Sequence, residues 1–447
     1  ANAKPLCDCG GEARLKEIRG STPASRFLVL ELAERLPFEP RILGYLRLDP
    51  PIPRMHRRTP EGVERDIRER IFPRDWFHPT YEGGADWQKA LDRVNTAAAR
   101  IARVVVHPDY RSEGFGALLV RVALEWAKER GAPEARREKH LVYTIAQMAR
   151  YHPFFEKVGF RYLFDTASGR PVLFYPLTEE AEAHLERFLR EDPYAKAHGG
   201  RLYKPRFGRV PGLPGPIRLA GVHKAYRSHL DLEGLSREVQ EALLAFGVKA
   251  RVVERAVLRG ASLEIPPGSL VVLAGASGAG KTTLLRLLLG EAPDAGEVAV
   301  PPGRRVAYIP GEREVDLGEA PILEAVYRRL KDVGAAIEVL NRVGLSDAVL
   351  YRARPHELST GQRERFRLAL LLAERPDLLL IDEFAAHLDV PTARRVALGL
   401  GKLCREAGVT LVAATHRPEV VAALDPDLLV YVGYGGLTTV PRRGPRT

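Results

Sequence analysis

The strongest constraint on the fold of this chain is a glycine-rich segment between an apolar run and a helical run. Residues 269–274 have the pattern of a buried strand, and residues 284–289 have that of a helix. The intervening residues 275–283 read GASGAGKTT, so backbone N–H groups can surround a polyphosphate at a helix N-terminus. We expect Lys281 to reach the β- and γ-phosphates and Thr282 to ligate Mg²⁺. The candidate phosphate-binding residues are Gly275, Ser277, Gly278, Gly280, Lys281, Thr282 and Thr283.

A second predicted strand ends in two adjacent carboxylates. Residues 378–381 are apolar, and Asp382 and Glu383 follow directly. Two acids at the end of a buried strand need a cation, so we expect Asp382 to hold Mg²⁺ together with Thr282. Glu383 is the candidate base that polarises the attacking water. A further predicted strand, residues 409–414, is followed by Thr415 and His416.

Between these motifs lies the sequence LSTGQ at residues 358–362, with Ser359 placed to cap a helix. With Leu388-Asp389 and His416, this series of motifs resembles the ABC ATPase superfamily over about residues 216–440. The resemblance implies ATP and Mg²⁺ as ligands and a homodimer, because Ser359, Gly361 and Gln362 would face the γ-phosphate bound by a second copy. It further implies that Asp389 connects the two sites and His416 contacts the γ-phosphate. Tyr226 would stack on adenine, or it is a surface tyrosine at a strand end.

The resemblance has three departures. Gly311 stands where the family usually has a glutamine that couples the site to a partner, so that coupling is in doubt. The segment between Lys281 and Ser359 is short for a transporter-type helical subdomain. An insert at about 228–255 splits the first strand pair and contains a predicted helix, capped by Ser236 and ended by Gly247.

The N-terminal half contains another strand, glycine loop and helix. Residues 101–106, 107–117 and 118–130 resemble the GNAT acetyltransferases, with the resemblance spanning about residues 25–176. Acetyl-CoA is the implied ligand, with its pantetheine on the first strand and its pyrophosphate on the loop. The expected contacts are Val104, Val105, Val106, Arg111, Ser112, Glu113, Gly114, Phe115, Gly116 and Ala117. Phe155 occupies the position of the family's tyrosine acid, and Tyr151 replaces it if the segment is helical; packing is the alternative role for Tyr151.

The expected fold class is α/β throughout, with a GNAT-like mixed-sheet domain followed by an ABC ATPase domain of P-loop type with a helical subdomain. The expected organisation is an extension (1–24), the GNAT-like domain (25–192) with an insert at about 51–99, a linker (193–216), the ABC domain (217–440) and a tail (441–447). A helix over residues 177–192, capped by Thr178 and stopped by Pro193, precedes the linker.

Basic residues concentrate around this linker. Seven cations and no acid lie between Arg201 and Arg227, and the 51–99 insert adds basic and aromatic side chains. We hypothesise that the two segments hold RNA or DNA; a solvated linker and a plain structural embellishment are the alternatives. The insert residues in question are Arg54, Arg57, Arg58, Trp76, Phe77, His78, Tyr81 and Trp87.

The composition is that of a globular chain, with 45% hydrophobic and 28% charged residues. No uncharged apolar window of membrane-spanning length occurs, and the three cysteines form no disulfide framework, which favours a cytoplasmic protein without a membrane segment of its own. Cys7 and Cys9 are either free thiols or half of a zinc site. We expect an ATPase fused to an N-acetyltransferase acting on RNA or protein amines. The alternatives are a nucleic-acid repair ATPase with a non-catalytic GNAT domain, and the ATPase subunit of a transporter.

Overall fold

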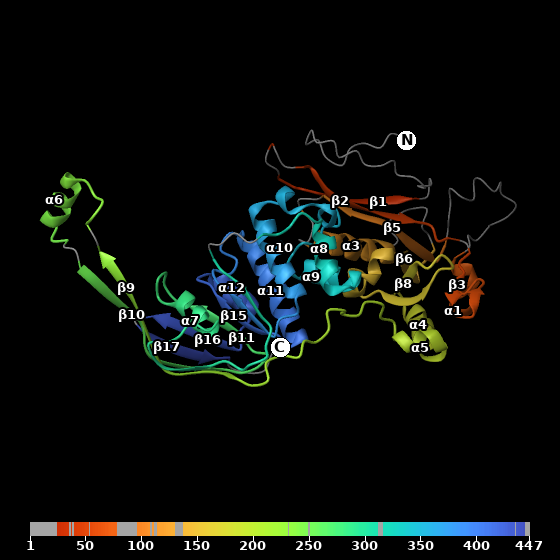
Figure 1. The fold of residues 1–447 in the computed structure, drawn as a ribbon. Coiled ribbons are helices and arrows are strands. Elements are labelled where there is room, and N and C mark those ends of the chain that lie inside the picture. The colour runs from red at the N-terminus through yellow and green to blue at the C-terminus, as the bar shows by residue number, and fades with distance from the viewer. Residues whose placement is uncertain are drawn as a thin grey trace. The chain divides into compact units, whose positions relative to one another are not determined.

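The chain divides into two compact units, Ala1–Lys204 and Pro205–Thr447, which are described separately (Figure 1). The computed structural model describes residues 25–442 except 35–36, 38–39, 53, 78–95, 108–109, 111–113, 130–136, 231, 249–250, 312–315 and 434. The predicted extension, the tail beyond residue 442, Cys7 and Cys9 lie outside the described residues.

A six-stranded mixed sheet forms the centre of the N-terminal unit. Its order is β1-β2-β5-β6-β8-β7, and all neighbours are antiparallel except β5 and β6. The strands are β1 (Arg26–Glu31), β2 (Ile42–Asp49), β5 (Ala98–Val106), β6 (Leu141–Ile145), β7 (Arg161–Asp165) and β8 (Pro171–Pro176). This parallel pair in an otherwise antiparallel sheet agrees with the predicted mixed-sheet class.

Helices cover both faces of that sheet because alternate strand residues are apolar on both sides. Helix α3 (Phe115–Glu129) packs Leu119, Val120 and Ala123 on one face with Leu46 and Ile101. On the other face, α1 (Arg68–Ile71) and α4 (Glu179–Glu191) pack with Tyr143 and Phe174. The predicted cap of α4 is confirmed: the Thr178 side chain accepts a hydrogen bond from Ala181 N–H, an interaction worth about 1 kcal/mol.

The predicted stop at Pro193 is only half right. Helix α4 ends before Pro193, but this proline then begins α5 (Pro193–His198), with Asp192 accepting from the N–H groups of Tyr194 and Ala195. Proline suits the first turn of a helix because its missing N–H has no intrahelical partner there. The first six residues of the expected linker are therefore helical.

The insert after β2 is part of the core rather than an exposed attachment. Its described part contains β3 (Arg57–Thr59), β4 (Gly62–Glu64), α1 and the short 3-10 helix η1 (Arg74–Trp76). Trp76 and Phe77 are buried, and Trp76 stacks on His140 with ring centroids 4.3 Å apart. The strand β5 begins at Ala98, close to the predicted end of the insert at about residue 99.

A six-stranded sheet also forms the centre of the C-terminal unit, in the order β13-β14-β15-β11-β16-β17. Its first five strands are parallel: β13 (Val306–Ile309), β14 (Leu378–Ile381), β15 (Thr410–Ala414), β11 (Leu270–Ala274) and β16 (Leu428–Gly433). The edge strand β17 (Gly436–Pro441) is antiparallel to β16. The strands predicted at 269–274, 378–381 and 409–414 are confirmed as β11, β14 and β15.

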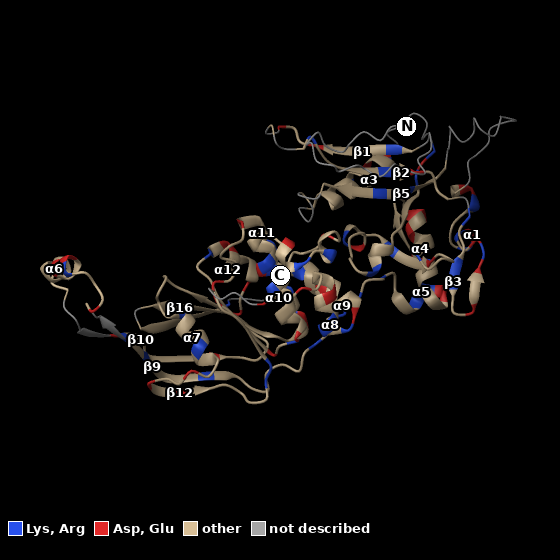
Figure 2. Ribbon diagram, turned by 45° about the horizontal axis from the view of Figure 1, so that its top comes forward, with Lys and Arg blue, Asp and Glu red and all other residues tan. Residues whose placement is uncertain are grey.

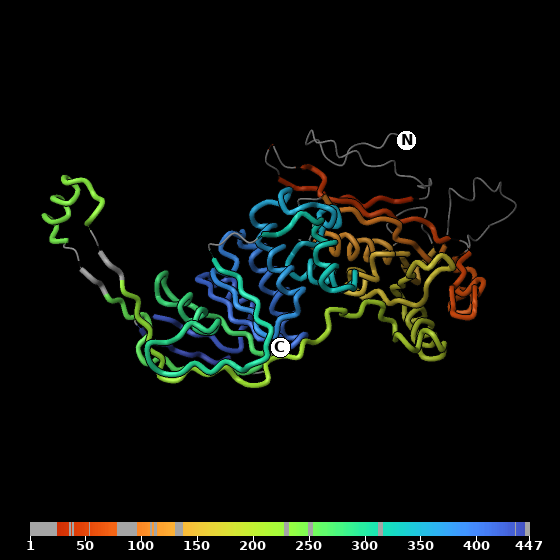
Figure 3. The backbone as a smooth tube through the Cα atoms, in the orientation of Figure 1, coloured from red at the N-terminus to blue at the C-terminus, as the bar shows by residue number. Residues whose placement is uncertain are grey.

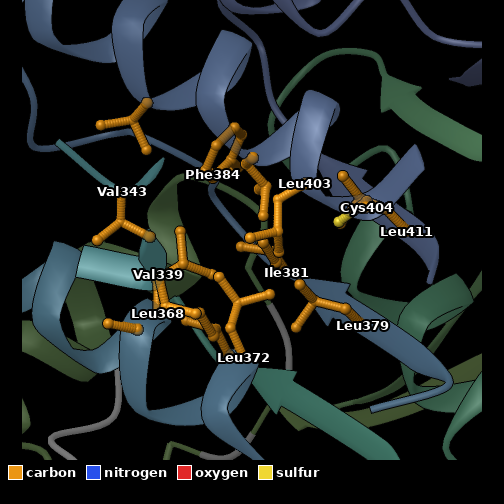
Figure 4. Packing of buried hydrophobic residues seen from close by; sticks show 14 of the residues in the cluster. Val339, Val343, Leu368, Leu372, Leu379, Ile381, Phe384, Leu403, Cys404 and Leu411 are labelled. Atoms are coloured by element: carbon orange, nitrogen blue, oxygen red, sulfur yellow. The ribbon is translucent and has the colours of Figure 1, made fainter. Parts of the chain in front are cut away.

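Two buried clusters cover the faces of this sheet. One packs α7 (Lys281–Leu288) on Val271, Leu273 and Leu380. The other joins the sheet to α10 (Thr360–Ala373) and α11 (Val390–Ala407), where Leu368 and Leu372 from α10 lie beside Leu379 and Ile381 (Figure 4). The remaining helices are α8 (Ile322–Leu330), α9 (Val333–Arg342), η5 (Leu350–Arg352), η6 (Pro355–Glu357) and α12 (Pro418–Leu424).

A long hairpin arm extends from this unit (Figure 3). Strand β9 (Ile217–Leu230) pairs with β10 (Arg251–Ile265) and with β12 (Ala295–Ala299), and α6 (Arg237–Ala245) lies between β9 and β10. The predicted insert helix is therefore confirmed, although Ser236 makes no side-chain cap bond. The predicted insert ends were wrong, because residues 228–230 and 251–255 continue the two strands.

Candidate functional site

Three parallel strands bring the predicted phosphate-binding motifs to one edge of the C-terminal sheet. β11 leads into the glycine loop, its neighbour β15 leads to His416, and the next strand, β14, leads to Asp382 and Glu383. Thr415 N–H donates to Leu273 O (3.1 Å), and Phe384 N–H donates to Ala414 O (2.8 Å). Carboxyl ends of adjacent parallel strands meet at one edge, which is where such sheets bind ligands.

The glycine loop wraps around the Lys281 side chain. The Lys281 ammonium donates to the carbonyl oxygens of Gly275 (2.9 Å) and Ala276 (2.8 Å). A side chain at Gly275 would collide with Val432 O, because its Cβ would lie 2.2 Å from that atom. At Gly280, where φ is +109°, a Cβ would lie 2.5 Å from Val257 Cγ1. Glycine at these two positions is therefore required by the close approach of neighbouring strands.

Thr282 and Asp382 meet as predicted. Thr282 Oγ1 donates to Asp382 Oδ2 at 2.7 Å, and Glu383 N–H donates to the other carboxylate oxygen at 3.1 Å. Asp382 is buried. A hydroxyl and a carboxylate side by side are ligands that suit Mg²⁺, which takes oxygen donors from one or two side chains together with substrate phosphates. The residues present therefore fit the expected metal.

Glu383 begins a conformationally unusual loop. Its φ is +50°, Ala385 has φ +63°, and the Glu383 side chain is exposed. Gly311 lies beside it, since a Cβ at position 311 would be 3.0 Å from Glu383 Cδ. The departure at position 311 thus leaves space that the Glu383 carboxylate occupies.

Tyr226 lies on β9 beside the glycine loop. It pairs in register with Arg255 of β10, and Arg255 Nη2 donates to Gly278 O at 3.0 Å. The half-buried Tyr226 ring donates its hydroxyl to Glu291 (3.2 Å) and lies 5.7 Å from the Lys224 ammonium. The adenine contact of Tyr226 stays a prediction, and Arg255 is a loop-binding residue that sequence reasoning missed. Sequence carried no signal for Arg255 because the link depends on strand register.

Ser359, Gly361 and Gln362 of the LSTGQ motif do not join this group. Ser359 accepts from Gln362 N–H (3.3 Å) while Gln362 Oε1 accepts from Ser359 N–H (3.0 Å), a capping box at the start of α10. The predicted Ser359 cap is confirmed. Helices α7 and α10 lie apart in both views of the ribbon (Figures 1 and 2). Asp389 caps α11 by accepting from Thr392 N–H at 2.8 Å, and His416 is exposed.

In the N-terminal unit, β5 and β6 separate after a short parallel pairing. Their register ends at Ile101 and Thr144, whereas the pairing of β5 with β2 continues to Val106. Val104, Val105 and Val106 therefore lie on the part of β5 beyond its β6 register. Gly114 has φ +89°, and a Cβ there would meet no atom of the described residues within 4 Å. Phe115, Gly116 and Ala117 form the first turn of α3. Arg111, Ser112 and Glu113 lie outside the described residues.

The predicted acid for acetyl transfer does not have the expected setting. Residues 147–158 contain two 3-10 turns, η3 (Gln147–Arg150) and η4 (Glu156–Val158), so Tyr151 and Phe155 do not share one helical face. Tyr151 was expected to replace the tyrosine acid only if this segment is helical. That condition is not met, because the chain turns between Tyr151 and Phe155. Phe155 packs in the core against Phe154 and Phe160. Burial, with a smaller effect of Lys157, lowers the pKa of His152 to about 4.

Part of the expected basic surface is paired with acids distant in sequence. Four of its cations pair with carboxylates: Arg206 with Asp332, Arg218 with Glu264, Lys224 with Glu291 and Asp294, and Arg227 with Glu254. Both signs of charge accordingly colour the C-terminal unit (Figure 2). Phe207 is buried, and buried Glu338 accepts from the N–H groups of Arg206 and Phe207. Residues 206–213 pack on the C-terminal unit, which is unlike a solvated linker, and the nucleic-acid role of the basic stretch stays a hypothesis.

The basic residues of the 51–99 insert include both a buried, paired arginine and exposed ones. Arg57 is 3% exposed and donates to Asp192 at 2.9 Å and to Glu64, so it cannot contact a nucleic acid. Arg54 and Arg58 are exposed. His78, Tyr81 and Trp87 lie outside the described residues.

Comparisons with known proteins agree with both halves of this geometry. Residues 258–386 match the family model described as ABC transporter. The chain is 34% identical over 198 residues to the zinc import ATP-binding protein ZnuC of Ruegeria pomeroyi, covering 43% of this chain and 75% of ZnuC. The chain belongs to the ABC ATPase family. Residues 82–162 of this ABC protein match the acetyltransferase (GNAT) domain model, so its N-terminal unit contains a GNAT domain.

Other relatives of this ABC protein extend the comparison. The lipoprotein-releasing system ATP-binding protein LolD 1 of Rhodospirillum rubrum is 35% identical over 193 residues, covering 38% of this chain and 84% of LolD 1. The methionine import ATP-binding protein MetN of Mesorhizobium japonicum is 34% identical, over 41% of this chain and 56% of MetN. The chain thus spans little more than half of MetN. A solved dimeric bacterial ABC transporter cassette has 22% identity and a TM-score of 0.37, covering 51% of this chain and all of the cassette. No described helix is long and apolar enough to cross a membrane.

Proposed function

We propose that this ABC protein hydrolyses ATP as a homodimer through its C-terminal unit and transfers an acetyl group from acetyl-CoA, through its GNAT domain, to an amine on RNA or protein. The observation that carries the ATPase half is the meeting of Thr282 with Asp382 at 2.7 Å, beside Lys281 and Glu383, at one sheet edge. These groups supply phosphate binding, metal binding and a base, which are the parts that phosphoryl transfer to water requires.

Each residue has a defined part in this proposal. ATP phosphate oxygens replace the Gly275 and Ala276 carbonyls around the Lys281 ammonium. Thr282 and Asp382 hold Mg²⁺, which when bound neutralises charge on the β- and γ-phosphate oxygens. Glu383 accepts a proton from water as the water oxygen bonds to the γ-phosphorus and the bond to the leaving ADP oxygen breaks. His416, at the end of β15, contacts the γ-phosphate.

The separation of motifs within one chain supports the proposed dimer. Each chain has one glycine loop and one LSTGQ motif, and α10, which begins in that motif, lies apart from α7. Ser359, Gly361 and Gln362 therefore act on ATP held by the second copy, with Asp389 connecting the two sites.

Separation of β5 from β6 supports acetyl-CoA binding. Backbone groups of Val104 to Val106 pair with the pantetheine arm, and N–H groups from Arg111 to Ala117 receive the pyrophosphate. The start of α3 favours anions through its dipole. The turn at residues 151–155 gives no support to Tyr151 as proton donor to the leaving thiolate, so the proposal assigns no residue to that role.

A transporter subunit is the second candidate function. The names of MetN, ZnuC and LolD 1 favour it. Against it stand the fused GNAT domain and Gly311 at the position of the coupling glutamine. Stable co-purification with membrane subunits distinguishes this candidate from the proposed function.

Two assays on the full chain test the proposed function. Wild type should release phosphate from ATP, while Lys281→Ala should not. Labelled acetyl-CoA should transfer its acetyl group to acid-precipitable RNA or protein from a cell extract, and omission of the chain is the control. Release of phosphate without any acetyl transfer would instead indicate that the GNAT domain is a non-catalytic binding module, as in the alternative of a nucleic-acid repair ATPase.

A further inference from the structure

Arg417, the residue after His416, fastens the loop that begins at Glu383. Its Nη1 donates to the carbonyl oxygens of Ala385 (2.7 Å) and Leu388 (2.5 Å), and its Nε donates to Glu419 at 2.7 Å. The side chain is 13% exposed. Its guanidinium is therefore directed into the loop and oriented there by a carboxylate.

The two carbonyls that Arg417 binds lie between the candidate base and the residue proposed to connect the two sites. Glu383 and Ala385 have positive φ values, a conformation that L-residues adopt only when neighbouring groups hold it. Leu388 directly precedes Asp389, which caps α11. A cation donating to both ends of this stretch fixes the direction of the backbone on either side.

Other contacts fix the middle of the loop to the residues that follow β15. Thr415 Oγ1 donates to Phe384 O (3.2 Å) and accepts from Arg417 N–H (3.3 Å). Residues 415–417 therefore touch the loop at Phe384, Ala385 and Leu388. His416 lies within this short segment, so a movement of His416 with the γ-phosphate would be transmitted to the loop through its neighbours.

We propose that Arg417 is a positioning residue for ATP hydrolysis, holding loop 383–389 so that Glu383 and Asp389 take their working positions when His416 contacts the γ-phosphate. The proposal rests on the proposed ATPase function. It assigns Arg417 no contact with ATP, so its loss should change the rate of the chemical step rather than the affinity for nucleotide.

The chain offers a matched control. Arg405 of α11 also donates to two backbone carbonyls, those of Leu424 and Asp425, each at 2.5 Å, and these lie at the far end of α12 from Arg417. Removal of either arginine takes a hydrogen-bond donor from two backbone carbonyl oxygens in the same unit. The carbonyl partners of Arg417 lie in loop 383–389, whereas those of Arg405 lie at the end of α12. A difference in kcat between the Arg417→Ala and Arg405→Ala variants therefore reports on positioning rather than on general stability.

The experiment measures kcat and KM for ATP in full-length wild type, Arg417→Ala, Arg417→Lys and Arg405→Ala. We expect Arg417→Ala to lower kcat about tenfold or more with KM within twofold, Arg417→Lys to recover part of kcat, and Arg405→Ala to stay within twofold of wild type. Equal kcat in Arg417→Ala and Arg405→Ala would overturn the proposal, as would a Lys variant no better than Ala. An inactive wild type would instead overturn the proposed function itself. Should Arg417→Ala not fold, Glu419→Gln tests the same orientation of Arg417 and should lower kcat with KM unchanged.

Discussion

Glu383 occupies the space that a side chain at Gly311 would need, since a Cβ at position 311 would lie 3.0 Å from Glu383 Cδ. Because the Glu383 side chain is exposed and flexible, Gly311→Ala should displace the carboxylate at little cost to folding. We expect kcat for ATP hydrolysis to fall about tenfold, which is less than the 10²- to 10⁴-fold effect of losing a general base, and KM to stay within twofold.

Steady-state kinetics on Gly311→Ala, with Gly215→Ala as the control, measure this effect. A Cβ at Gly215 meets nothing within 4 Å, and the residue lies in the same unit. A Gly311→Ala enzyme as fast as wild type would show that the observed position of Glu383 has no bearing on its role.

The surroundings of Gly116 provide a test of acetyl-CoA binding. A Cβ at Gly116 would lie 3.0 Å from the Phe154 ring, so a valine there fills both the expected pyrophosphate position and the space beside Phe154. We expect Gly116→Val to weaken acetyl-CoA binding at least about tenfold, or about 1.4 kcal/mol, by calorimetry on the full chain.

Phe154→Ala and the Gly116→Val/Phe154→Ala double variant separate the two causes. If the double variant binds as tightly as Phe154→Ala alone, the loss comes from displaced packing and the loop at residues 111–117 is not the pyrophosphate site.

His152 should make the N-terminal unit less stable in acid. Its pKa is about 4 in the folded unit and near 6.5 when unfolded, so the unfolded state binds more protons between these values. The contribution is present above pH 6.5 and is lost as pH falls toward 4, by about 3 kcal/mol at most. Fluorescence follows this unit, because all three tryptophans, Trp76, Trp87 and Trp126, lie within residues 1–204.

The measurement is urea unfolding of wild type and His152→Gln from pH 7 to 4.5. The glutamine does not titrate, so the difference in unfolding free energy between the two proteins should change with pH in favour of the variant. A difference that stays constant across this range would contradict the assigned pKa.

The motifs of the C-terminal unit could be predicted from the sequence because each combines local residue chemistry with a strand or helix pattern. Lys281, Thr282, Asp382 and Glu383 each follow a predicted strand, and parallel strands bring their ends together. Ser359 as a helix cap is equally local. The same reasoning gave the strand, glycine loop and helix around Gly114 and Gly116.

The failures at charged residues share a physical cause, which is pairing between residues distant in the sequence. The sequence does not reveal that Arg57 is paired, because its partner Asp192 lies 135 positions away, and it does not reveal the partners of Lys224, because Glu291 and Asp294 follow much later. The prediction at Pro193 fails for a local reason, because a proline that stops one helix also starts another when a residue such as Asp192 caps it. Arg417 carried no motif, because its carbonyl partners are recognisable only in three dimensions.

The most direct test of the central claim is sedimentation velocity of Glu383→Gln with and without Mg²⁺ and ATP. The amide keeps the shape of the side chain but cannot take a proton from water, so ATP should stay bound between the glycine loop of one copy and Ser359 of the other. We predict a dimer that carries two ATP molecules in the presence of Mg²⁺ and ATP and a monomer without nucleotide. A variant that binds ATP yet remains a monomer, or that hydrolyses ATP at the wild-type rate, would contradict the account.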